Sequence, residues 1–164
     1  MIVVSNTSPL INLANIGQLH LLKQLYGQVI IPPAVYDEIV IAGVGQPGAM
    51  EVKTYDWFKV EQISNQQMVT LLQIDVDIGE AEAIVLALEM KPDLLLLDER
   101  KGRQVASNLG IKFTGILGIL IEAKNNQLIN AIKPIMDDLI KQVGFRISSK
   151  LYQRVLQIAN EQLP

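Results

Sequence analysis

The chain has 164 residues, of which 49% are hydrophobic and 19% are charged. This length suits one domain with an ordinary core, and this composition excludes a disordered chain. The net charge of −3 disfavours tight, indiscriminate binding of nucleic acid, although an acidic protein can still present a local basic patch. With no cysteine and a single histidine, the chain cannot form disulfides or thiolate zinc sites, and His20 offers little to catalysis of the Ser-His-Asp or Cys-His type.

No apolar run approaches the ~18 residues that a membrane-spanning helix requires. The N-terminus lacks the basic and apolar regions of a signal peptide. We therefore expect a cytoplasmic protein that makes no contact with a membrane.

Short apolar runs alternate with helical patterns along most of the chain. The predicted strands are Ile2–Val4, Val29–Ile31, Phe58–Val60, Leu94–Leu97 and Lys112–Thr114. The predicted helices include Leu19–Tyr26, Ala34–Ile41, Gly79–Met90, Arg100–Leu109, Ile116–Asn125, Ala131–Gln142 and Ser148–Gln162. This order predicts an α/β fold with three layers, in which helices cover a mainly parallel central sheet of about five strands. We expect one domain over residues 1–164, with an α/β core over 1–124 and a helical C-terminal extension over 125–164.

Proline and glycine mark several boundaries between these elements. Ser8 can cap the first helix with Pro9 at its first position, and Pro32-Pro33 can open a later helix. The segment Ala42–Gly48 is predicted to be an exposed loop. Its three glycines match the dinucleotide-binding pattern G-x-G-x-x-G, but the pattern follows a helix and contains a proline, so we reject a dinucleotide site.

Acidic residues stand beside or just after several of the predicted strands and helices. They are Glu38, Glu80, Glu82 and Asp98, and the polar turn Ser5–Ser8 follows the first strand. The carboxyl ends of parallel strands meet at one edge of a sheet, where open α/β folds place their sites. Carboxylates gathered there repel one another unless a hard cation lies among them, which indicates Mg²⁺ or Mn²⁺ and phosphodiester chemistry.

Each acid also has an ordinary structural explanation. Glu38 borders the buried stripe of its predicted helix, but surface helices commonly carry such acids. Glu80 and Glu82 lie roughly 200° apart around a helix, so normally only one of them can face a site. Both are also favoured at a helix N-terminus by the helix dipole. Asp98 is the most informative of the four, because it directly follows a run of four leucines.

Three cations begin the helix after Asp98, namely Arg100, Lys101 and Arg103. Cations in a first helical turn oppose the helix dipole, so local stability does not favour them there. Contact with a substrate phosphate is one explanation, and a solvated helix face is the other.

Five sequence blocks resemble a prokaryotic subfamily of PIN domains, in order over about residues 2–124. They are IVVSNTSPLINL, PPAVYDEI, GEAEAIVLA, LLDERKGR and TGILG. The resemblance implies an α/β/α fold whose conserved acids bind Mg²⁺ or Mn²⁺ and hydrolyse single-stranded or structured RNA. Many such proteins are toxins paired with an antitoxin protein, and many form homodimers, so both partners are implied here.

The resemblance also implies roles for individual residues. The catalytic acids would be Glu38, Glu82 and Asp98, and the metal ligands would be these three together with Asn6 and Glu80. The residues that contact the substrate would be Thr7, Ser8, Arg100, Lys101 and Arg103. Asn6 stands where the family usually has its first aspartate, and an amide oxygen can bind a metal but adds no negative charge and cannot act as a base.

Two other functions compete with the nuclease. A degenerate PIN domain would bind RNA or a protein without cutting, and Asn6 is the residue that favours it. A receiver-type signalling domain would need a phosphorylatable aspartate and a lysine at a later strand end. Asp98 meets the first requirement, but no lysine clearly meets the second.

Overall fold

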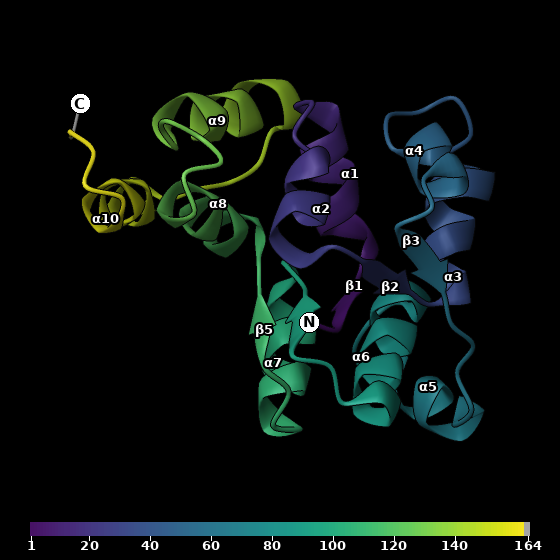
Figure 1. Ribbon diagram of the computed structural model, residues 1–164. Coiled ribbons are helices and arrows are strands. Elements are labelled where there is room, and N and C mark those ends of the chain that lie inside the picture. Colours follow the sequence, from purple (N-terminus) through teal and green to yellow (C-terminus); the bar gives the residue numbers. More distant parts are fainter. Residues whose placement is uncertain (163–164) are drawn as a thin grey trace.

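The computed structural model describes residues 1–162 and contains a five-stranded sheet in which every neighbouring pair of strands is parallel. The strands are β1 (Val3–Ser5), β2 (Val29–Ile31), β3 (Phe58–Val60), β4 (Leu94–Leu96) and β5 (Phe113–Thr114). Their order is β3-β2-β1-β4-β5, with helices on both faces (Figure 1). The predicted three-layer α/β/α fold is therefore confirmed.

The helices before β4 are α1 (Thr7–Asn15), α2 (His20–Tyr26), α3 (Pro33–Tyr36), the π-helix η1 (Asp37–Ala42), α4 (Ala49–Thr54), α5 (Gln66–Leu72) and α6 (Ile78–Met90). Those after β4 are α7 (Arg100–Asn108), α8 (Ile116–Asn125), α9 (Lys133–Asp138), the π-helix η2 (Leu139–Val143) and α10 (Ser149–Ile158). Within residues 1–162, no helix combines the length and the hydrophobicity that crossing a membrane requires.

Alternate residues along the short strands face two separate cores. Val3 packs with apolar side chains of α1, α2 and α8, whereas Val4 packs with those of α5, α6 and α7. The run of leucines divides in the same way, since Leu96 joins the first core and Leu97 the second. In the centre of the sheet Val3, Val4 and Leu95 are 0% exposed, which explains why the central strands contain continuous apolar runs.

The start of the first helix differs from the prediction. Asn6, not Ser8, occupies the N-cap position, and its side chain makes no capping hydrogen bond. Pro9 is the third helical residue, where a missing N–H costs no intrahelical hydrogen bond because the first turn has no partners for its N–H groups. The Ser8 hydroxyl is thereby free to donate to the Glu99 carboxylate at 3.0 Å.

The segment after β2 also departs from a regular helix. Pro33 opens α3 as predicted, but the helix widens to a π-helix at Asp37 and continues through Ala42. The loop predicted over Ala42–Gly48 is confirmed from Gly43 onward, because η1 ends at Ala42. The short helices α4 and α5 follow, and neither was predicted. Both are six or seven residues long and lie beside turn-forming residues, so their apolar periodicity is too brief to detect.

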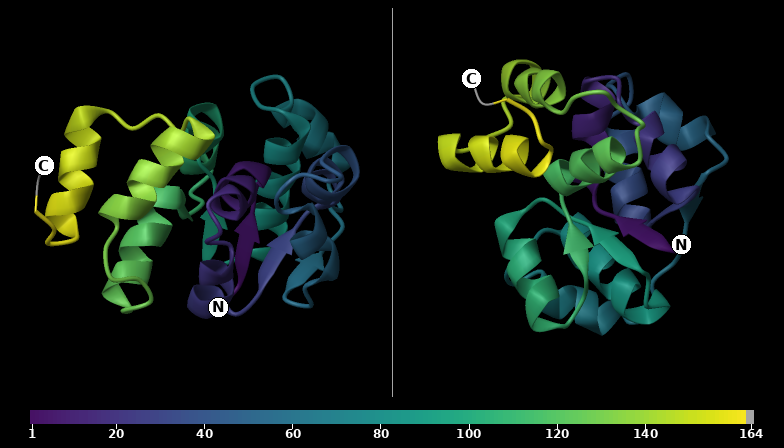
Figure 2. Two further views of the ribbon diagram at one scale, coloured as in Figure 1. Left: turned by 90° about the horizontal axis from the view of Figure 1, so that it is seen from above. Right: turned by 60° about the vertical axis from the view of Figure 1, so that its left-hand side comes forward.

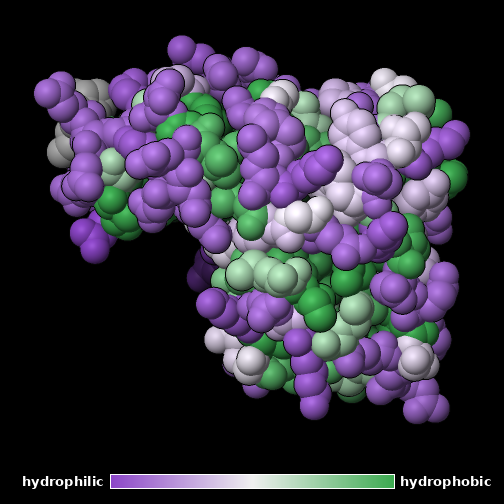
Figure 3. Space-filling view, viewed as in Figure 1, coloured by the Kyte–Doolittle hydropathy of each residue, from purple (hydrophilic) through white to green (hydrophobic). Residues whose placement is uncertain are grey.

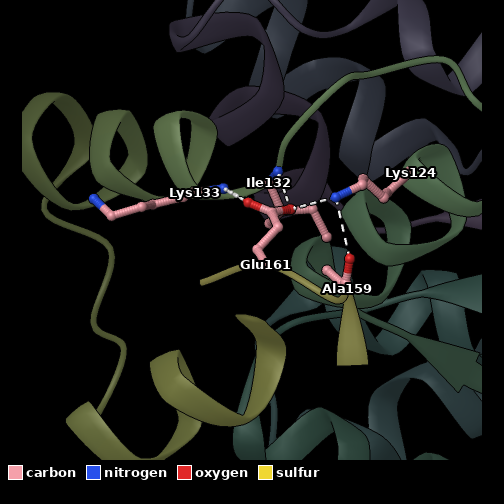
Figure 4. A network of polar contacts seen from close by, with 5 residues as sticks. All are labelled: Lys124, Ile132, Lys133, Ala159 and Glu161. Carbon is pink, nitrogen blue, oxygen red and sulfur yellow. Dashed lines mark hydrogen bonds and ion pairs between the residues drawn. The ribbon is translucent and has the colours of Figure 1, made fainter. Parts of the chain in front are cut away.

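The C-terminal arm, which we define as α9, η2 and α10, extends away from the sheet (Figure 2). Glu161, which follows α10, connects the end of the arm to the start of α9 and to α8 (Figure 4). The Glu161 carboxylate accepts hydrogen bonds from Ile132 N at 2.7 Å, from Lys133 N at 3.1 Å and from Lys124 Nζ at 2.9 Å. Burial alone would raise the pKa of this carboxyl, but these donors hold it below its ordinary value.

Glu161→Ala should lower the free energy of unfolding by about 2 kcal/mol, because hydrogen bonds to a charged group contribute about 1.5–3 kcal/mol. The substitution leaves Lys124 without its carboxylate and two backbone N–H groups without acceptors. Urea unfolding measures the change, with Gln157→Ala on the exposed face of α10 as a control. Equal losses in the two variants would show that Glu161 does not hold the arm.

Candidate active site

The candidate site lies where β1 and β4 end side by side. The chain passes from β1 to β2 on one side and returns through β4 on the other, so this is the switch point of the sheet. The backbone N–H of Asn6 donates to Leu96 O at 3.0 Å. This bond fixes Asn6 one residue beyond β1 and next to the strand end that carries Asp98.

Asp98 is held by the start of α8 and by an arginine. Its Oδ1 atom accepts a hydrogen bond from Ile116 N at 3.0 Å and lies 3.6 Å from Arg103 Nη2. Its Oδ2 atom is buried and has no hydrogen-bond partner in the described chain. Burial raises the pKa of Asp98, and the Glu99 charge adds to the rise, while Ile116 N–H and Arg103 oppose it. One oxygen of Asp98 is thus anchored, and the other is buried without a partner.

Glu38 reaches the same edge from the π-helix η1. Position 79 in the first turn of α6 is a glycine, and a Cβ atom there would collide with Glu38 Oε1. The carboxylate of Glu38 therefore lies against the N-terminus of α6, where the helix dipole favours a negative charge. Its pKa is nevertheless raised, first by burial and then by the charges of Asp77 and Glu82. Thr7 Oγ1 is buried and has no hydrogen-bond partner among residues 1–162.

Glu80 and Glu82 are both buried on α6 but face different neighbours. Glu82 Oε1 accepts a hydrogen bond from Ala34 N at 2.9 Å, at the start of α3. Glu80 faces α7, since a Cβ atom at Gly102 would stand 2.8 Å from its Oε2 atom. Both nevertheless belong to one acidic region. The charge of Glu38 raises the pKa of Glu80, and the charge of Glu82 raises the pKa of Glu38.

Burial raises the pKa of Glu80 from 4.5 to about 7, with further contributions from Asp77, Glu99 and Glu38. Asp77 caps α6 by accepting a hydrogen bond from Glu80 N at 2.8 Å, and therefore holds its own charge next to Glu80. The cations Arg100 and Lys101 face the same hollow of about 320 Å³ without pairing with these acids.

The raised pKa of Glu80 predicts a loss of stability as the pH rises. Between pH 4.5 and about 7 the folded protein keeps a proton on Glu80 that the unfolded chain releases, so unfolding becomes more favourable across this range. We expect the free energy of unfolding, measured in EDTA, to fall by about 1–3 kcal/mol between about pH 5 and about pH 8.

Glu80→Gln should remove most of that decrease, and the exposed control Glu61→Gln should keep it. Urea unfolding at a series of pH values measures both. A decrease of the same size in the Glu80→Gln variant would show that another group causes it.

The predicted substrate contacts divide into two sets. Arg103 is occupied within the protein: its Nε donates to Leu97 O at 2.8 Å, and its guanidinium stacks 5.4 Å from the centre of the Phe113 ring. Arg100 and Lys101 are exposed and form no ion pair within the described chain. Arg103 is therefore engaged by Asp98, Leu97 and Phe113, whereas Arg100 and Lys101 are open to solvent.

The donors at this edge suit a hard cation by their chemistry, because carboxylate, hydroxyl and amide oxygens are what Mg²⁺ and Mn²⁺ prefer. Two of them, Asp98 Oδ2 and Thr7 Oγ1, are buried without partners. However, nowhere in residues 1–162 do three His, Cys, Asp or Glu side chains form a group close enough to hold a metal ion. The acids surround one edge without forming a compact ligand set.

Sequence reasoning missed several residues that shape this edge. They are Asp77, which caps α6, Glu99, which accepts from Ser8, and the glycines Gly79, Gly102 and Gly115, whose missing side chains admit Glu38, Glu80 and the Arg103–Asp98 pair. Only Asp77 had a detectable signal, because Asp77-Ile-Gly-Glu80 has the spacing of a helix capping box.

The five-stranded parallel sheet between two layers of helices, with acids at its central switch point, has the three-layer α/β/α arrangement of a PIN-like fold. The chain belongs to the PIN-domain family DUF3368, whose family model matches residues 2–161. PIN domains are generally dependent on a divalent metal and act on nucleic acid. No curated protein and no solved structure gives a significant match to the chain.

Proposed function

We propose that this protein is a ribonuclease that hydrolyses phosphodiester bonds with the help of Mg²⁺ or Mn²⁺. The observation that carries the proposal is the free, buried Oδ2 atom of Asp98 beside the end of β1. A buried carboxylate oxygen without a donor is costly unless a ligand binds it. The family and the surrounding acids support a cation as that ligand.

The ligands of the cation would come from Asn6, Glu38, Glu80, Glu82 and Asp98, which surround this edge without forming a compact group in residues 1–162. Mg²⁺ or Mn²⁺ bound there would lower the pKa of a water molecule and offset the charge of the scissile phosphate. Glu38 would orient the attacking water, since its carboxylate lies at the N-terminus of α6 and next to Thr7. Arg103 would keep Asp98 in place, and Arg100 and Lys101 would face the phosphate.

Cleavage of a labelled single-stranded RNA by the purified protein tests this proposal. We expect cleavage in Mn²⁺ or Mg²⁺ and none after addition of EDTA. A folded protein that cleaves none of a varied set of RNAs in either metal would contradict a ribonuclease function.

The second candidate function is binding without cleavage. Two observations favour it: Asn6 is buried at the position of the first acid, and no three acids form a compact group in the described part of the chain. Such a protein would bind RNA or a protein partner at the same edge. It would retain affinity for RNA in EDTA and show no cleavage in any metal.

Further proposals concern the domain bounds, the partners and the location of the protein. We propose a single PIN-like domain over residues 1–164, with the helices after residue 124 as an extension of the α/β core. Because the resemblance is to toxins of the PIN class, an antitoxin protein and a second copy of the chain are the proposed partners, and the cytoplasm is the proposed location.

A further inference from the structure

We infer that the C-terminal arm binds the RNA strand that leads away from the acidic edge. The inference rests on the proposed function for the identity of the strand. Its structural basis is a surface that we call the arm groove, which consists of a hollow between β5, the start of α8 and the segment before α10, and of the adjoining exposed face of α10. The groove comprises two hollows of about 400 and 490 Å³ that meet at Leu151. Figure 3 shows the molecule deeply notched below the arm.

The arm groove begins at the candidate active site. Its inner hollow is lined by Asp98, Arg103 and Gly115, and across from them by Phe145 and Arg146. A strand whose phosphate lies at Asp98 would meet this hollow directly, because Asp98 lines it. The half-buried ring of Phe145 gives it an apolar wall, and flat apolar surfaces of this kind accept nucleobases by stacking.

The outer hollow adds positive charge where the rest of the molecule is acidic. Residues 144–158 contain Arg146, Lys150 and Arg154 and no acid, although acids outnumber cations in the whole chain by 17 to 14. Lys150 and Arg154 line the outer hollow, and all three cations are exposed. None of the three forms an ion pair within residues 1–162. Their charges are thus available to phosphates.

Local stability does not account for these cations. Lys150 lies in the first turn of α10, where the helix dipole opposes a positive charge. Lys150 and Arg154 are four residues apart on one helix face, and like charges at this spacing destabilise a helix. The buried residues Val155 and Leu156 already fasten α10 to the first core. The cationic face is therefore explained by a polyanion such as single-stranded RNA rather than by folding.

Binding of a fluorescent single-stranded RNA of about twelve nucleotides, measured by anisotropy in EDTA, tests the arm groove. Working in EDTA separates this test from the proposed catalysis, since binding is measured whether or not the protein can cleave. The variant Lys150→Gln with Arg154→Gln should bind about tenfold more weakly at physiological salt. The slope of log affinity against log salt should fall by about 1.4, because each single-strand phosphate contact contributes about 0.7.

Two controls make the outcome decisive. Lys53→Gln with Lys59→Gln removes the same charge from exposed positions on α4 and β3 and should bind like wild type. Lys150→Arg keeps the charge and should also bind like wild type. Equal affinity and equal salt slope in wild type and the Lys150/Arg154 variant would overturn the inference, as would an equal loss in the Lys53/Lys59 control.

Discussion

Asp98→Asn is expected to reduce metal-dependent cleavage of RNA by about 10²-fold or more, because even residues that only support a metal ligand cost about 10- to 100-fold when replaced. The change removes the negative charge from the free Oδ2 position. It keeps a side-chain oxygen that can accept from Ile116 N, so the contact with the start of α8 can persist. Rates of cleavage at saturating Mn²⁺ measure the effect.

The exposed aspartate Asp56 provides a matched control for Asp98. Asp56→Asn makes the same chemical change at the opposite end of the sheet and should leave the rate unchanged. Circular dichroism should show that both variants are folded. Undiminished cleavage by a highly purified Asp98→Asn protein would exclude Asp98 from the catalytic site.

Asn6→Asp is expected to have opposite effects with and without metal. Asn6 is 3% exposed and stands beside the strand end of Asp98, so a carboxylate there adds another buried charge to an acidic region. In EDTA this should lower the free energy of unfolding by about 1–3 kcal/mol, the typical cost of a poorly satisfied buried group. In Mn²⁺ the added charge should strengthen metal binding and restore the melting temperature by mass action.

Cleavage by the Asn6→Asp variant distinguishes the two candidate functions. If wild type is a nuclease limited by the absence of a negative charge at Asn6, the variant should cleave faster at low Mn²⁺ concentration. If wild type only binds RNA because of Asn6, the variant should gain cleavage that wild type lacks. The exposed control Asn130→Asp should change neither property. A melting temperature of the Asn6→Asp variant that does not respond to Mn²⁺ would contradict a cation site at this edge.

The fold and the position of Asp98 follow directly from local sequence patterns. Each strand is a short apolar run, and the structure places all five at or within one residue of their predicted bounds. Asp98 was located because four leucines precede it, and a buried parallel strand must end at the carboxyl edge of the sheet. The place of each strand in the sheet, and of Asp98 at its edge, is therefore determined by residues that are adjacent in the sequence.

The surroundings of the acids were not predictable in the same way. Arg103 resembles a substrate-binding cation in sequence, but it pairs with Asp98 and Leu97 because α7 folds back over the strand end. The chain widens into the π-helix η1 at Asp37, directly before Glu38, and no residue in the segment signals this widening. The space for Glu38 depends on Gly79, about 40 residues later in the chain, and such contacts appear only after packing.

A calorimetric titration of Mn²⁺ into metal-free wild type, beside the Asp98→Asn protein, tests the central claim without any choice of substrate. The acidic edge predicts a saturable binding heat in wild type that is lost or strongly weakened in the variant. Binding of Mn²⁺ with the same affinity by both proteins, or by neither, would contradict a metal site built around Asp98.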